Sequence, residues 1–409
     1  PEVRLGDFEN PDGVVINEGD KFVLTTKMCL GNEKKCYVNY EGLPRDVKAG
    51  TVILINDGLI SMKVDSVKGS DIHCTVIDGG LLTNHKGVNV PGVELNMPYL
   101  SERDMNDLKF GAKHDFDFIA ASFVRSATDV TILRNFVEAI GWKDVKIVSK
   151  IENTQGVDNI DDIIAVSDGI MVARGDLGVE IPMEEVPIRQ KEFIRKCCQA
   201  GKPVITATQM LESMVNSPRP TRAEVSDVAN AIYDQTSAIM LSAESAAGKY
   251  PIECVKTMDK IAKSIEGSIK YWKRFKNREY DLSGSDFEFN LNHSTCMTAM
   301  NMDVKAIFAY THTGRTAKTL AGFLPKCPIY AITDNKTIYK QLALIFGVRP
   351  VYVETKESID EMIDEGVNII EKVKAVKEGD LIAIAGGASI LAGQNGRSMN
   401  KTIGGILKI

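Results

Sequence analysis

The stretch Ile147-Val148-Ser149-Lys150-Ile151-Glu152-Asn153 is typical of a short apolar strand that ends in polar residues. Because successive side chains of a strand point to opposite faces, Lys150 and Glu152 are expected on the same face. The apolar run at 169–173 predicts a second buried strand, and Arg174-Gly175-Asp176-Leu177-Gly178 follows it as the start of a helical turn. The unpaired N–H groups at such a turn can bind an anion.

Together these two strands predict a site that handles phosphate. If they are neighbours in a parallel sheet, Glu152 and Asp176 supply oxygen ligands for Mg²⁺, and Lys150 adds a fixed positive charge beside them. Each stretch also has a simpler interpretation: Lys150 and Glu152 could form a solvated ion pair, and residues 174–178 could form an ordinary turn. Their common position at the carboxyl ends of strands, where α/β folds place their chemistry, favours a functional site.

Composition limits the class of protein. The chain has 409 residues, 44% hydrophobic and 25% charged, which suffices for two or three domains with their own cores. A net charge of −6 and a pI near 5.6 argue against a general nucleic-acid binder. We find no apolar run near the roughly 20 residues that span a bilayer, and no signal peptide, so we expect a cytoplasmic protein that is not bound to membranes.

Cysteine and histidine give no sign of a metal or redox centre. The 8 cysteines are scattered without a Cys-x-x-Cys pair, which predicts reduced, structural thiols. The 5 histidines have neither metal-ligand nor triad spacing. Acid–base chemistry is therefore expected from Lys, carboxylates, hydroxyls or metal-bound water.

Residues 5–97 consist of short alternating apolar runs separated by turn signals, which predicts a small all-β domain. Asp57 lies in an Asn-Asp-Gly turn, and Lys86 lies in the Lys-Gly-Val-Asn segment near the end of this domain. Both residues are interpreted either as solvated loop residues or as parts of a binding site. In the second case the small domain would act as a lid.

Strand and helix patterns alternate over residues 98–268, which predicts parallel strands joined by right-handed crossovers. Ser101-Glu102-Arg103-Asp104 begins the first helix as a capping box. Five strands are too few to close an eight-stranded barrel. Residues 1–4 are therefore interpreted as the end of a further strand, and the all-β domain is inserted after that strand.

Polar residues cluster where the five strands end: Ser122, Arg125, Lys150, Glu152, Asp176, Thr208, Gln209, Ser242 and Glu244. Such a cluster is typical of a barrel mouth, and we include Ser122, Arg125 and Ser242 in the active site.

Residues 269–409 predict a second α/β unit that resembles a small doubly wound sheet, with a polar and aromatic linker at 271–289. Thr311-His312-Thr313-Gly314-Arg315-Thr316 begins a helix directly after a strand, where hydroxyl and N–H groups can bind a phosphate. Residues 386–397, rich in Gly, Ser and Asn and ending in Arg397, would cover the same ligand. Flexible loops are the alternative for both segments.

Four segments resemble the pyruvate kinase family in order and spacing: Ser-Lys-Ile-Glu-Asn at 149–153, Met-Val-Ala-Arg-Gly-Asp-Leu-Gly at 171–178, Ala-Thr-Gln-Met-Leu-Glu-Ser-Met at 207–214 and Pro-Arg-Pro-Thr-Arg-Ala-Glu at 218–224. The resemblance covers essentially the whole chain. It implies an α/β fold with a (β/α)8 TIM-type barrel, N-terminally incomplete here, formed by residues 1–4 and 98–268. A small β-barrel lid is inserted at 5–97, and a C-terminal α/β regulatory domain follows at 269–409.

The resemblance implies that phosphate passes from phosphoenolpyruvate to ADP, giving pyruvate and ATP in glycolysis, with Mg²⁺ or Mn²⁺ and K⁺ as cofactors. Lys150 would contact the transferring phosphoryl group. Glu152 and Asp176 would hold the divalent metal. The amides of Gly175 and Asp176, with Thr208, would bind the substrate carboxylate, and Thr208 would lie on the route that protonates the enolate.

Further expectations follow from the same resemblance. Arg4, Asp57 and Lys86 would face the nucleotide, beneath the closing β domain. Glu2 matches the position at which K⁺-dependent members carry Glu. A sugar-phosphate effector is expected near Thr311, Thr313, Gly314, Arg315, Thr316 and Arg397. The resemblance also suggests a homotetramer, with 218–224 near a subunit contact.

One departure from the family keeps alternatives open. The family's first two barrel strands, with a motif that binds phosphate and K⁺, have no counterpart in this chain, which begins at Pro1-Glu2. An N-terminally truncated, inactive fragment that only binds ligands is one alternative. A Mg²⁺-dependent lyase barrel that forms a pyruvate enolate is another, although a lyase needs neither the inserted domain nor Lys150. ADP-dependent formation of pyruvate would distinguish a kinase from both.

Overall fold

A computed structural model describes residues 2–280, 282, 287–355, 359–372, 374–386 and 403–408. The chain forms two compact units. The first comprises Pro1–Phe193, Thr206–Glu212 and Met240–Ala246, and the second comprises Ile194–Ile205, Ser213–Ile239 and Ala247–Ile409. Among the described residues, no helix is both long enough and apolar enough to cross a membrane.

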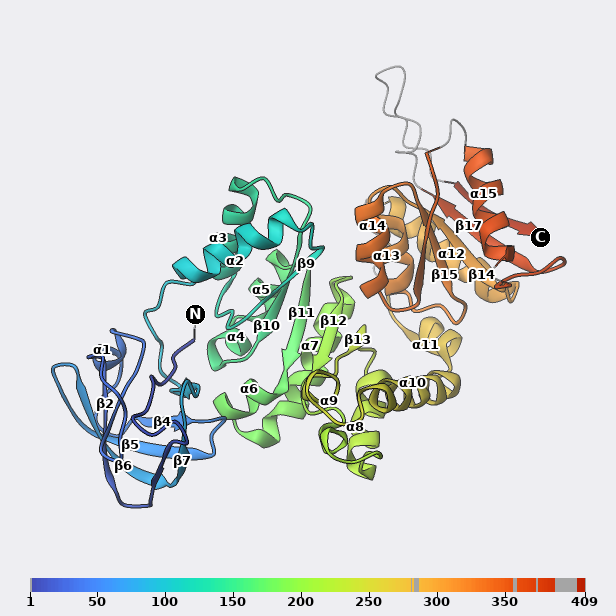
Figure 1. Ribbon diagram of the computed structural model, residues 1–409. Helices are drawn as coiled ribbons and strands as arrows, with labels where there is room; N and C mark the ends of the chain where they lie inside the picture. Colours follow the sequence, from blue (N-terminus) through green and yellow to red (C-terminus); the bar gives the residue numbers. More distant parts are fainter. Residues whose placement is uncertain are drawn as a thin grey trace. The chain divides into compact units, whose positions relative to one another are not determined.

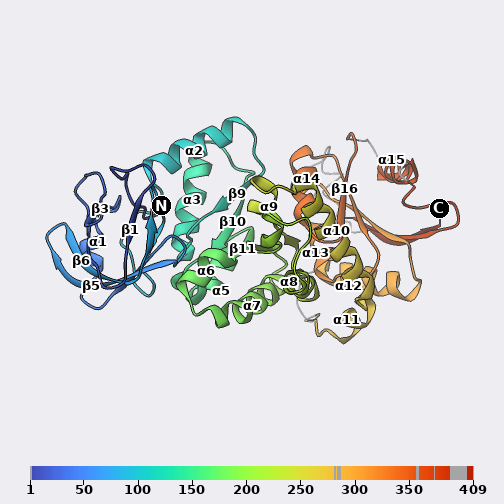
Figure 2. The ribbon, with the colours of Figure 1, turned by 60° about the horizontal axis from the view of Figure 1, so that its bottom comes forward.

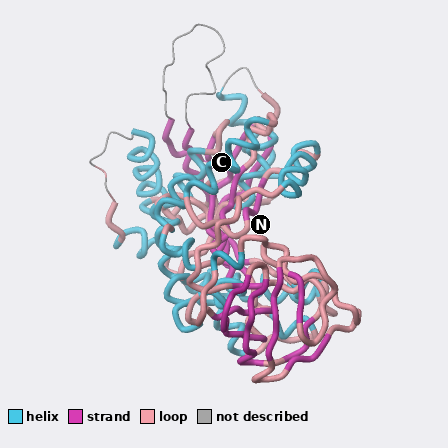
Figure 3. The backbone as a smooth tube through the Cα atoms, turned by 90° about the vertical axis from the view of Figure 1, so that its left-hand side faces the viewer, coloured by secondary structure: helices cyan, strands magenta, loops and turns pink. Residues whose placement is uncertain are grey.

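The first unit begins with the predicted all-β domain, whose strands curl around a common core (Figure 3). Its strands are β1 (Val14–Ile16), β2 (Lys21–Thr25), β3 (Lys35–Tyr37), β4 (Val52–Ile55), β5 (Ile60–Lys68), β6 (Asp71–Asp78), β7 (Gly80–Leu82) and β8 (Val88–Asn89), with one short helix, α1 (Leu43–Asp46). Six of them form a sheet in the order β3-β2-β6-β5-β4-β8, while β1 pairs with β7. Alternate residues such as Ile72, Cys74 and Val76 are buried, as the period of two predicts.

The turn between β4 and β5 holds Asn56, Asp57 and Gly58, all with positive φ (56°, 55° and 80°). Short polar side chains and glycine tolerate this left-handed conformation best, which explains the Asn-Asp-Gly sequence. Strand β8 pairs with β4, so that Val88 lies opposite Ile55. The turn that carries Asp57 and the segment that follows Lys86 are therefore neighbours in one sheet.

A five-stranded sheet follows, in the order β13-β12-β11-β10-β9 (Figure 1). Its strands are β9 (Phe118–Ala121), β10 (Lys146–Ile151), β11 (Gly169–Ala173), β12 (Val204–Ala207) and β13 (Ala238–Ile239). Strand β10 is parallel to both β9 and β11, as the β/α alternation predicts. The last strand has only two residues, and Ser242 lies in the turn before the next helix.

Helices alternate with these strands, and Figure 2 shows α2, α3, α5 and α6 arranged around the sheet. The helices of this region are α2 (Glu102–Lys113), α3 (Ala127–Ala139), α4 (Thr154–Asp158), α5 (Ile160–Val166), α6 (Arg174–Glu180), η1 (Met183–Glu185), α7 (Val186–Gln199), η2 (Glu212–Val215), α8 (Arg222–Tyr233), α9 (Ala243–Ala246) and α10 (Pro251–Ser268). The capping box at Ser101 is confirmed, since Ser101 Oγ accepts from Asp104 N (3.1 Å) and Asp104 Oδ2 accepts from Ser101 N (2.9 Å).

The second unit contains the doubly wound sheet predicted for the C-terminal region, in the order β16-β15-β14-β17-β18. Its elements are α11 (Tyr271–Asn277), α12 (Phe287–Asn301), β14 (Ala306–Tyr310), α13 (Arg315–Gly322), β15 (Ile329–Thr333), α14 (Lys336–Gln341), η3 (Leu342–Leu344), β16 (Val348–Tyr352), α15 (Ile359–Lys372), β17 (Leu381–Gly386) and β18 (Ile403–Lys408). Strand β14 is parallel to both β15 and β17. Strand β18, which was not predicted, pairs with β17 in the antiparallel direction.

The predicted linker at 271–289 is wrong in part, because helix α11 occupies its first seven residues and α12 begins at Phe287. Phe275 is 3% exposed and packs edge-on against Phe323, with ring centroids 6.2 Å apart. The aromatic residues that suggested a linker are therefore core residues of the second unit.

Candidate functional site

Lys150, Glu152 and Asp176 come to one edge of the sheet because β10 and β11 are parallel neighbours. Lys150 lies opposite Met171 in the register, and Ile151 lies opposite Val172. Glu152 follows the end of β10, and Asp176 lies in the first turn of α6, which begins where β11 ends. The predicted pairing of these two strands is confirmed.

Glu152 is completely buried beside a cation. Lys150 Nζ lies 2.5 Å from Glu152 Oε1 and donates to Ser122 Oγ at 3.2 Å. Glu152 Oε2 accepts a hydrogen bond of 2.6 Å from Phe123 N. Oε1 is buried, and within the part of the chain that the structure describes its one polar partner is the Lys150 ammonium. Oε1 therefore keeps acceptor capacity for a further ligand.

The electrostatics of Glu152 fit a bound divalent cation. Burial raises the pKa of Glu152, and the nearby Asp176 carboxylate acts in the same direction, whereas Lys150 and Phe123 N lower it. A divalent cation would favour the ionised forms of both carboxylates. No cluster of three or more His, Cys, Asp or Glu exists among the described residues. The chain would thus supply two carboxylates, which suits Mg²⁺, since this ion commonly keeps water and substrate oxygens as its other ligands.

Thr208 and Gly175, which the family resemblance assigns to one carboxylate site, lie in contact. Thr208 Oγ1 accepts from Gly175 N at 2.7 Å and donates to Ala207 O at 2.6 Å. Thr208 has a φ of 69° and Gln209 has a φ of 53°. A β-branched residue rarely adopts this conformation, and such strain persists only where the surroundings enforce it.

Arg174 enforces this turn, and sequence reasoning did not identify it. Its guanidinium donates to Thr208 O at 2.6 Å, to Ala207 O at 3.3 Å and to Gln190 Oε1 at 3.3 Å. The donors hold the backbone on both sides of Thr208 Cα in place. The only signal in the sequence is the position of Arg174 immediately before Gly175.

Arg125 and Ser242, which were predicted for the active site together with Ser122, make mainly structural contacts. Arg125 binds the Asp129 carboxylate with Nε and Nη2, both at 3.0 Å, and donates to the carbonyls of Leu95 (3.0 Å) and Met97 (3.1 Å). It thereby anchors the segment that returns from the β domain. Ser242 N donates to Glu244 Oε2 at 2.7 Å, and Ser242 Oγ is buried without a hydrogen bond among the described residues.

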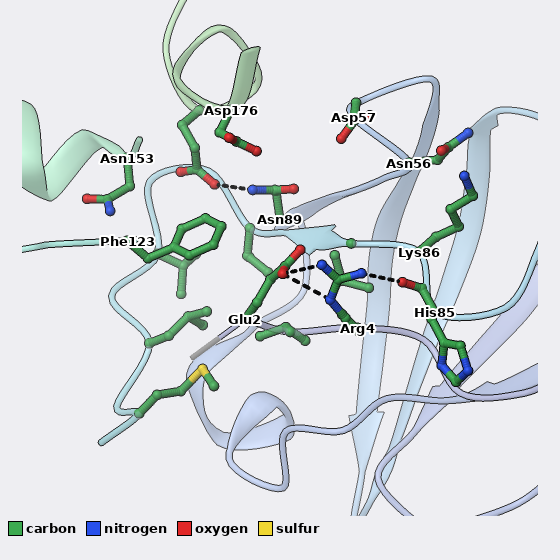
Figure 4. Close-up of a pocket in the computed structure, with 18 of the residues that line it drawn as sticks. Glu2, Arg4, Asn56, Asp57, His85, Lys86, Asn89, Phe123, Asn153 and Asp176 are labelled. Carbon is green, nitrogen blue, oxygen red and sulfur yellow. Dashed lines mark hydrogen bonds and ion pairs between the residues drawn. The ribbon is translucent and has the colours of Figure 1, made fainter. Parts of the chain in front are cut away.

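A cavity of about 550 Å³ contains the residues predicted for the nucleotide (Figure 4). Asp57 and Lys86 line it from the β domain, Arg4 lines it from the segment that precedes this domain, and Asp176 lines it from α6. Lys150, Glu152 and Thr208 are not part of this lining. Its other lining residues are Glu2, Val3, Asn56, Asn84, His85, Gly87, Val88, Asn89, Val90, Val93, Leu95, Met97, Phe123, Arg125, Asn153, Gln155 and Glu180.

Polar contacts join several of the residues that line this cavity. Glu2 Oε2 accepts from Arg4 Nε (2.9 Å) and Nη2 (2.5 Å), while Arg4 Nη1 donates to His85 O at 2.9 Å. Asn89 Nδ2 donates to Glu180 Oε1 at 3.0 Å. Burial raises the pKa of Glu180, the Asn89 hydrogen bond lowers it, and Asp176 raises it further. Sequence reasoning singled out neither Asn89 nor Glu180.

In the second unit, the predicted effector segment forms the turn before α13. Gly314, with a φ of 80°, is the N-cap residue, and its N–H donates to Thr311 Oγ1 at 2.9 Å. Glu288 Oε1 accepts from Thr316 Oγ1 (3.0 Å), and Glu288 Oε2 pairs with Arg315 Nε (3.0 Å). Thr313 and Arg315 line a second cavity of about 550 Å³. Arg397 and most of the 386–397 segment lie outside the described residues.

Comparison with known proteins gives a consistent result. Residues 1–255 match the family described as "Pyruvate kinase, barrel domain", and residues 290–399 match "Pyruvate kinase, alpha/beta domain". The chain is 46% identical over 388 residues to a pyruvate kinase of Clostridium acetobutylicum, with 95% of this chain and 82% of that protein covered. It is 47% identical over 399 residues to the pyruvate kinase of Clostridium perfringens, with 97% and 84% covered.

A third relative, the pyruvate kinase of Geobacillus stearothermophilus, is 47% identical over 392 residues, which are 95% of this chain and 66% of that protein. The parallel β/α sheet, the β domain and the C-terminal α/β sheet agree with these matches and with a TIM-type barrel accompanied by further domains. The chain therefore belongs to the pyruvate kinase family of phosphotransferases.

Proposed function

We propose that this chain transfers the phosphoryl group of phosphoenolpyruvate to ADP, with uptake of one proton, to give pyruvate and ATP in glycolysis. The observation that supports this proposal most directly is Glu152, a fully buried carboxylate with one oxygen that lacks a hydrogen bond among the described residues and lies beside Lys150 Nζ. A fold without a ligand gains little from such a group, because burial of a charge is costly.

Lys150 would act on the phosphoryl group. Its ammonium is fixed from two sides by Ser122 Oγ and Glu152 Oε1, so its charge needs no rearrangement when negative charge moves during the reaction. Preorganised charges of this kind stabilise a transition state more than flexible ones do. Mg²⁺ or Mn²⁺ held by Glu152 and Asp176 would supply a Lewis acid that neutralises phosphoryl and enolate oxygens.

Thr208 and the start of α6 would hold the three-carbon part of the substrate. Gly175 N is already directed at Thr208 Oγ1, and Arg174 fixes the carbonyl of Thr208. A bound carboxylate would replace the hydroxyl as the acceptor for this amide. Thr208 would then be placed to pass a proton toward the enolate, and a water molecule would be its donor, because a hydroxyl alone is a weak acid.

The cavity beneath the β domain would bind the nucleotide. Lys86 and Arg4 supply positive charge for the diphosphate, and Asp57 lies on the neighbouring turn. Closure of this domain would exclude water and so protect the phosphoryl group from hydrolysis.

Several finer assignments stand as proposals beside the reaction. K⁺ is proposed as an activator with Glu2 nearby, and a sugar-phosphate effector is proposed at the turn before α13. A cytoplasmic homotetramer is proposed, and so is the division into residues 1–4 with 98–268, 5–97 and 269–409. For Glu2, the ion pair with Arg4 places a carboxylate at the edge of the nucleotide cavity.

The test is a lactate-dehydrogenase-coupled assay of the purified chain with phosphoenolpyruvate, ADP, Mg²⁺ and K⁺. We expect pyruvate formation that requires ADP and Mg²⁺, with one ATP formed per pyruvate. Omission of ADP separates a kinase from a phosphatase or lyase, and the Lys150→Met variant provides the background rate. Pyruvate formation without ADP, or binding of both substrates without turnover, would overturn the proposal.

A further inference from the structure

Helix α6 has two different environments along its length. Its first turn contains Gly175 and Asp176, which belong to the phosphoenolpyruvate and metal side of the site. Its last two residues, Val179 and Glu180, contact the β domain. The helix has seven residues, so these two ends are separated by only about 10 Å at 1.5 Å per residue.

The contact with the β domain has an apolar and a polar part. A methyl group added at Gly58 would lie 3.7 Å from Val179 Cγ1, so the Asn56–Gly58 turn lies close to the helix with room for little more than a methyl group between them. Next to it, Asn89 Nδ2 donates to Glu180 Oε1 at 3.0 Å, and both residues are partly buried. This hydrogen bond connects strand β8 to α6.

Asn89 is rigidly connected to the residues proposed for the nucleotide. Strand β8 pairs with β4, with Asn89 opposite Leu54. In addition, Asn56 N donates to Gly87 O at 3.1 Å, which joins the turn of Asp57 to the segment of Lys86. A displacement of Asn89 therefore moves both of these residues.

We propose that Asn89 and Glu180 are positioning residues for the nucleoside diphosphate: their hydrogen bond holds the β domain on α6 so that Asp57 and Lys86 face Asp176 across the cavity. This inference rests on the proposed function. Both residues line the cavity, and the effect proposed for them comes from the hydrogen bond between them and not from contact with the nucleotide. The contact should affect affinity for ADP and leave the binding of phosphoenolpyruvate, at the first turn of α6, nearly unchanged.

Two truncations and one conservative variant test the hydrogen bond. Asn89→Ala and Glu180→Ala should each raise KM for ADP about tenfold, because one hydrogen bond to a carboxylate has roughly that effect. KM for phosphoenolpyruvate and kcat should stay within about twofold. Glu180→Gln should restore most of the ADP affinity, because the amide oxygen still accepts from Asn89. The double variant Asn89→Ala/Glu180→Ala should be no worse than either single variant.

Asn17→Ala is the matched control, since Asn17 is an exposed residue of the same domain and is not part of the cavity lining. It should leave all three constants unchanged. If a truncation raised both KM values and lowered kcat by similar factors, the proposal would be overturned, because such a result would indicate general destabilisation. A Glu180→Gln variant as impaired as Glu180→Ala would contradict the role of the hydrogen bond.

Hydrogen exchange separates this inference from the proposed reaction. In Glu180→Ala, the backbone amide of Asn56 should exchange faster, because its hydrogen bond to Gly87 O lies in the segment of the β domain that is no longer held on α6. The amides of β10 should exchange at an unchanged rate. Calorimetric titration with ADP should show the same tenfold loss of affinity. Both measurements apply even if the chain shows no turnover. Unchanged exchange at residues 56–58 together with unchanged ADP affinity would overturn the proposal.

Discussion

Lys150 Nζ lies 2.5 Å from Oε1 of the completely buried Glu152, two residues further along the chain. In a buried ion pair the cost of removing two charges from water is comparable to the attraction gained, so such a pair adds little to stability. Since Oε1 makes no hydrogen bond among the described residues, the fold does not exhaust its capacity as an acceptor. This arrangement supports the proposed role of the pair in binding a ligand.

Replacement of Lys150 by Met should lower kcat about 10³-fold or more, because it removes a fixed charge from the transition state. Mn²⁺ binding should survive, since both carboxylates remain. The coupled assay measures the first effect and electron paramagnetic resonance of Mn²⁺ the second. Lys63→Met, at an exposed position of β5, is the control for loss of a lysine. A decrease in kcat of less than tenfold would contradict the assignment of Lys150.

Asp176→Ala should weaken Mn²⁺ binding at least tenfold, because one of two carboxylate ligands is lost. The same titration with Lys150→Met provides the contrast, as that variant keeps both ligands. Asp158→Ala changes an exposed carboxylate of α4 and should bind Mn²⁺ like the unmodified chain. If Asp176→Ala binds Mn²⁺ normally, Asp176 is not a ligand.

Thr208 can be tested with a pair of near-isosteric variants. Thr208→Val keeps the branched shape at a φ of 69° but removes the hydroxyl proposed to contact the substrate and to pass a proton to the enolate. We therefore expect kcat/KM for phosphoenolpyruvate to fall about 10²-fold. Thr208→Ser keeps the hydroxyl and should retain most of the activity. Equal activities of the two variants would show that the hydroxyl takes no part in the reaction.

Sequence reasoning located the central residues because strand periodicity and position at strand ends are local properties. The spacing of Lys150 and Glu152 placed them on one face, and the parallel pairing of β10 with β11 brought Asp176 to the same edge. Thr208 and Gly175 were assigned to one carboxylate site by resemblance to the family, and the hydrogen bond between them shows that they are neighbours.

The residues that sequence reasoning missed act through contacts between distant segments. Arg174 reaches the carbonyls of 207 and 208, more than thirty residues away, and Asn89 reaches Glu180 across 91 residues. No periodicity or turn signal encodes such a contact. The linker predicted at 271–289 failed for a similar reason: only the packed structure shows that Phe275 belongs to a core.

In the segment proposed for the effector, Glu288 already pairs with Arg315 and accepts from Thr316, so it would compete with a bound phosphate for both residues. Arg315→Ala should weaken binding of sugar phosphates about tenfold or more, because it removes a guanidinium that can donate two hydrogen bonds to one phosphate group. Glu288→Gln should strengthen binding a few-fold, since it removes the competing charge. Calorimetric titration with a panel of sugar phosphates measures both. Changes of the same sign in the two variants would contradict this account.

Asp168 supports the start of the strand that carries Lys150. Its Oδ2 accepts from Ile147 N (2.9 Å) and from Arg134 Nη2 (2.5 Å), and Lys146 Nζ lies 3.8 Å from Oδ1. Burial acts to raise the pKa of Asp168, but the contacts with Arg134, Ile147 N and Lys146 outweigh it and lower the pKa. A carboxyl with a lowered pKa stabilises the fold above its unfolded pKa of about 3.9, and this contribution disappears as the pH falls through the folded value.

Asp168→Asn should therefore cost about 2 kcal/mol of unfolding free energy at pH 7, where the charged hydrogen bonds are complete. The difference from the unmodified chain should shrink as the pH is lowered below about 4, because the aspartic acid is then also neutral. Urea denaturation at a series of pH values measures it. Asp107→Asn, in an exposed pair with Arg103 at 3.9 Å, should change stability little at any pH. If the loss at Asp168 were the same at pH 3 and pH 7, its charge would not be what stabilises the start of β10.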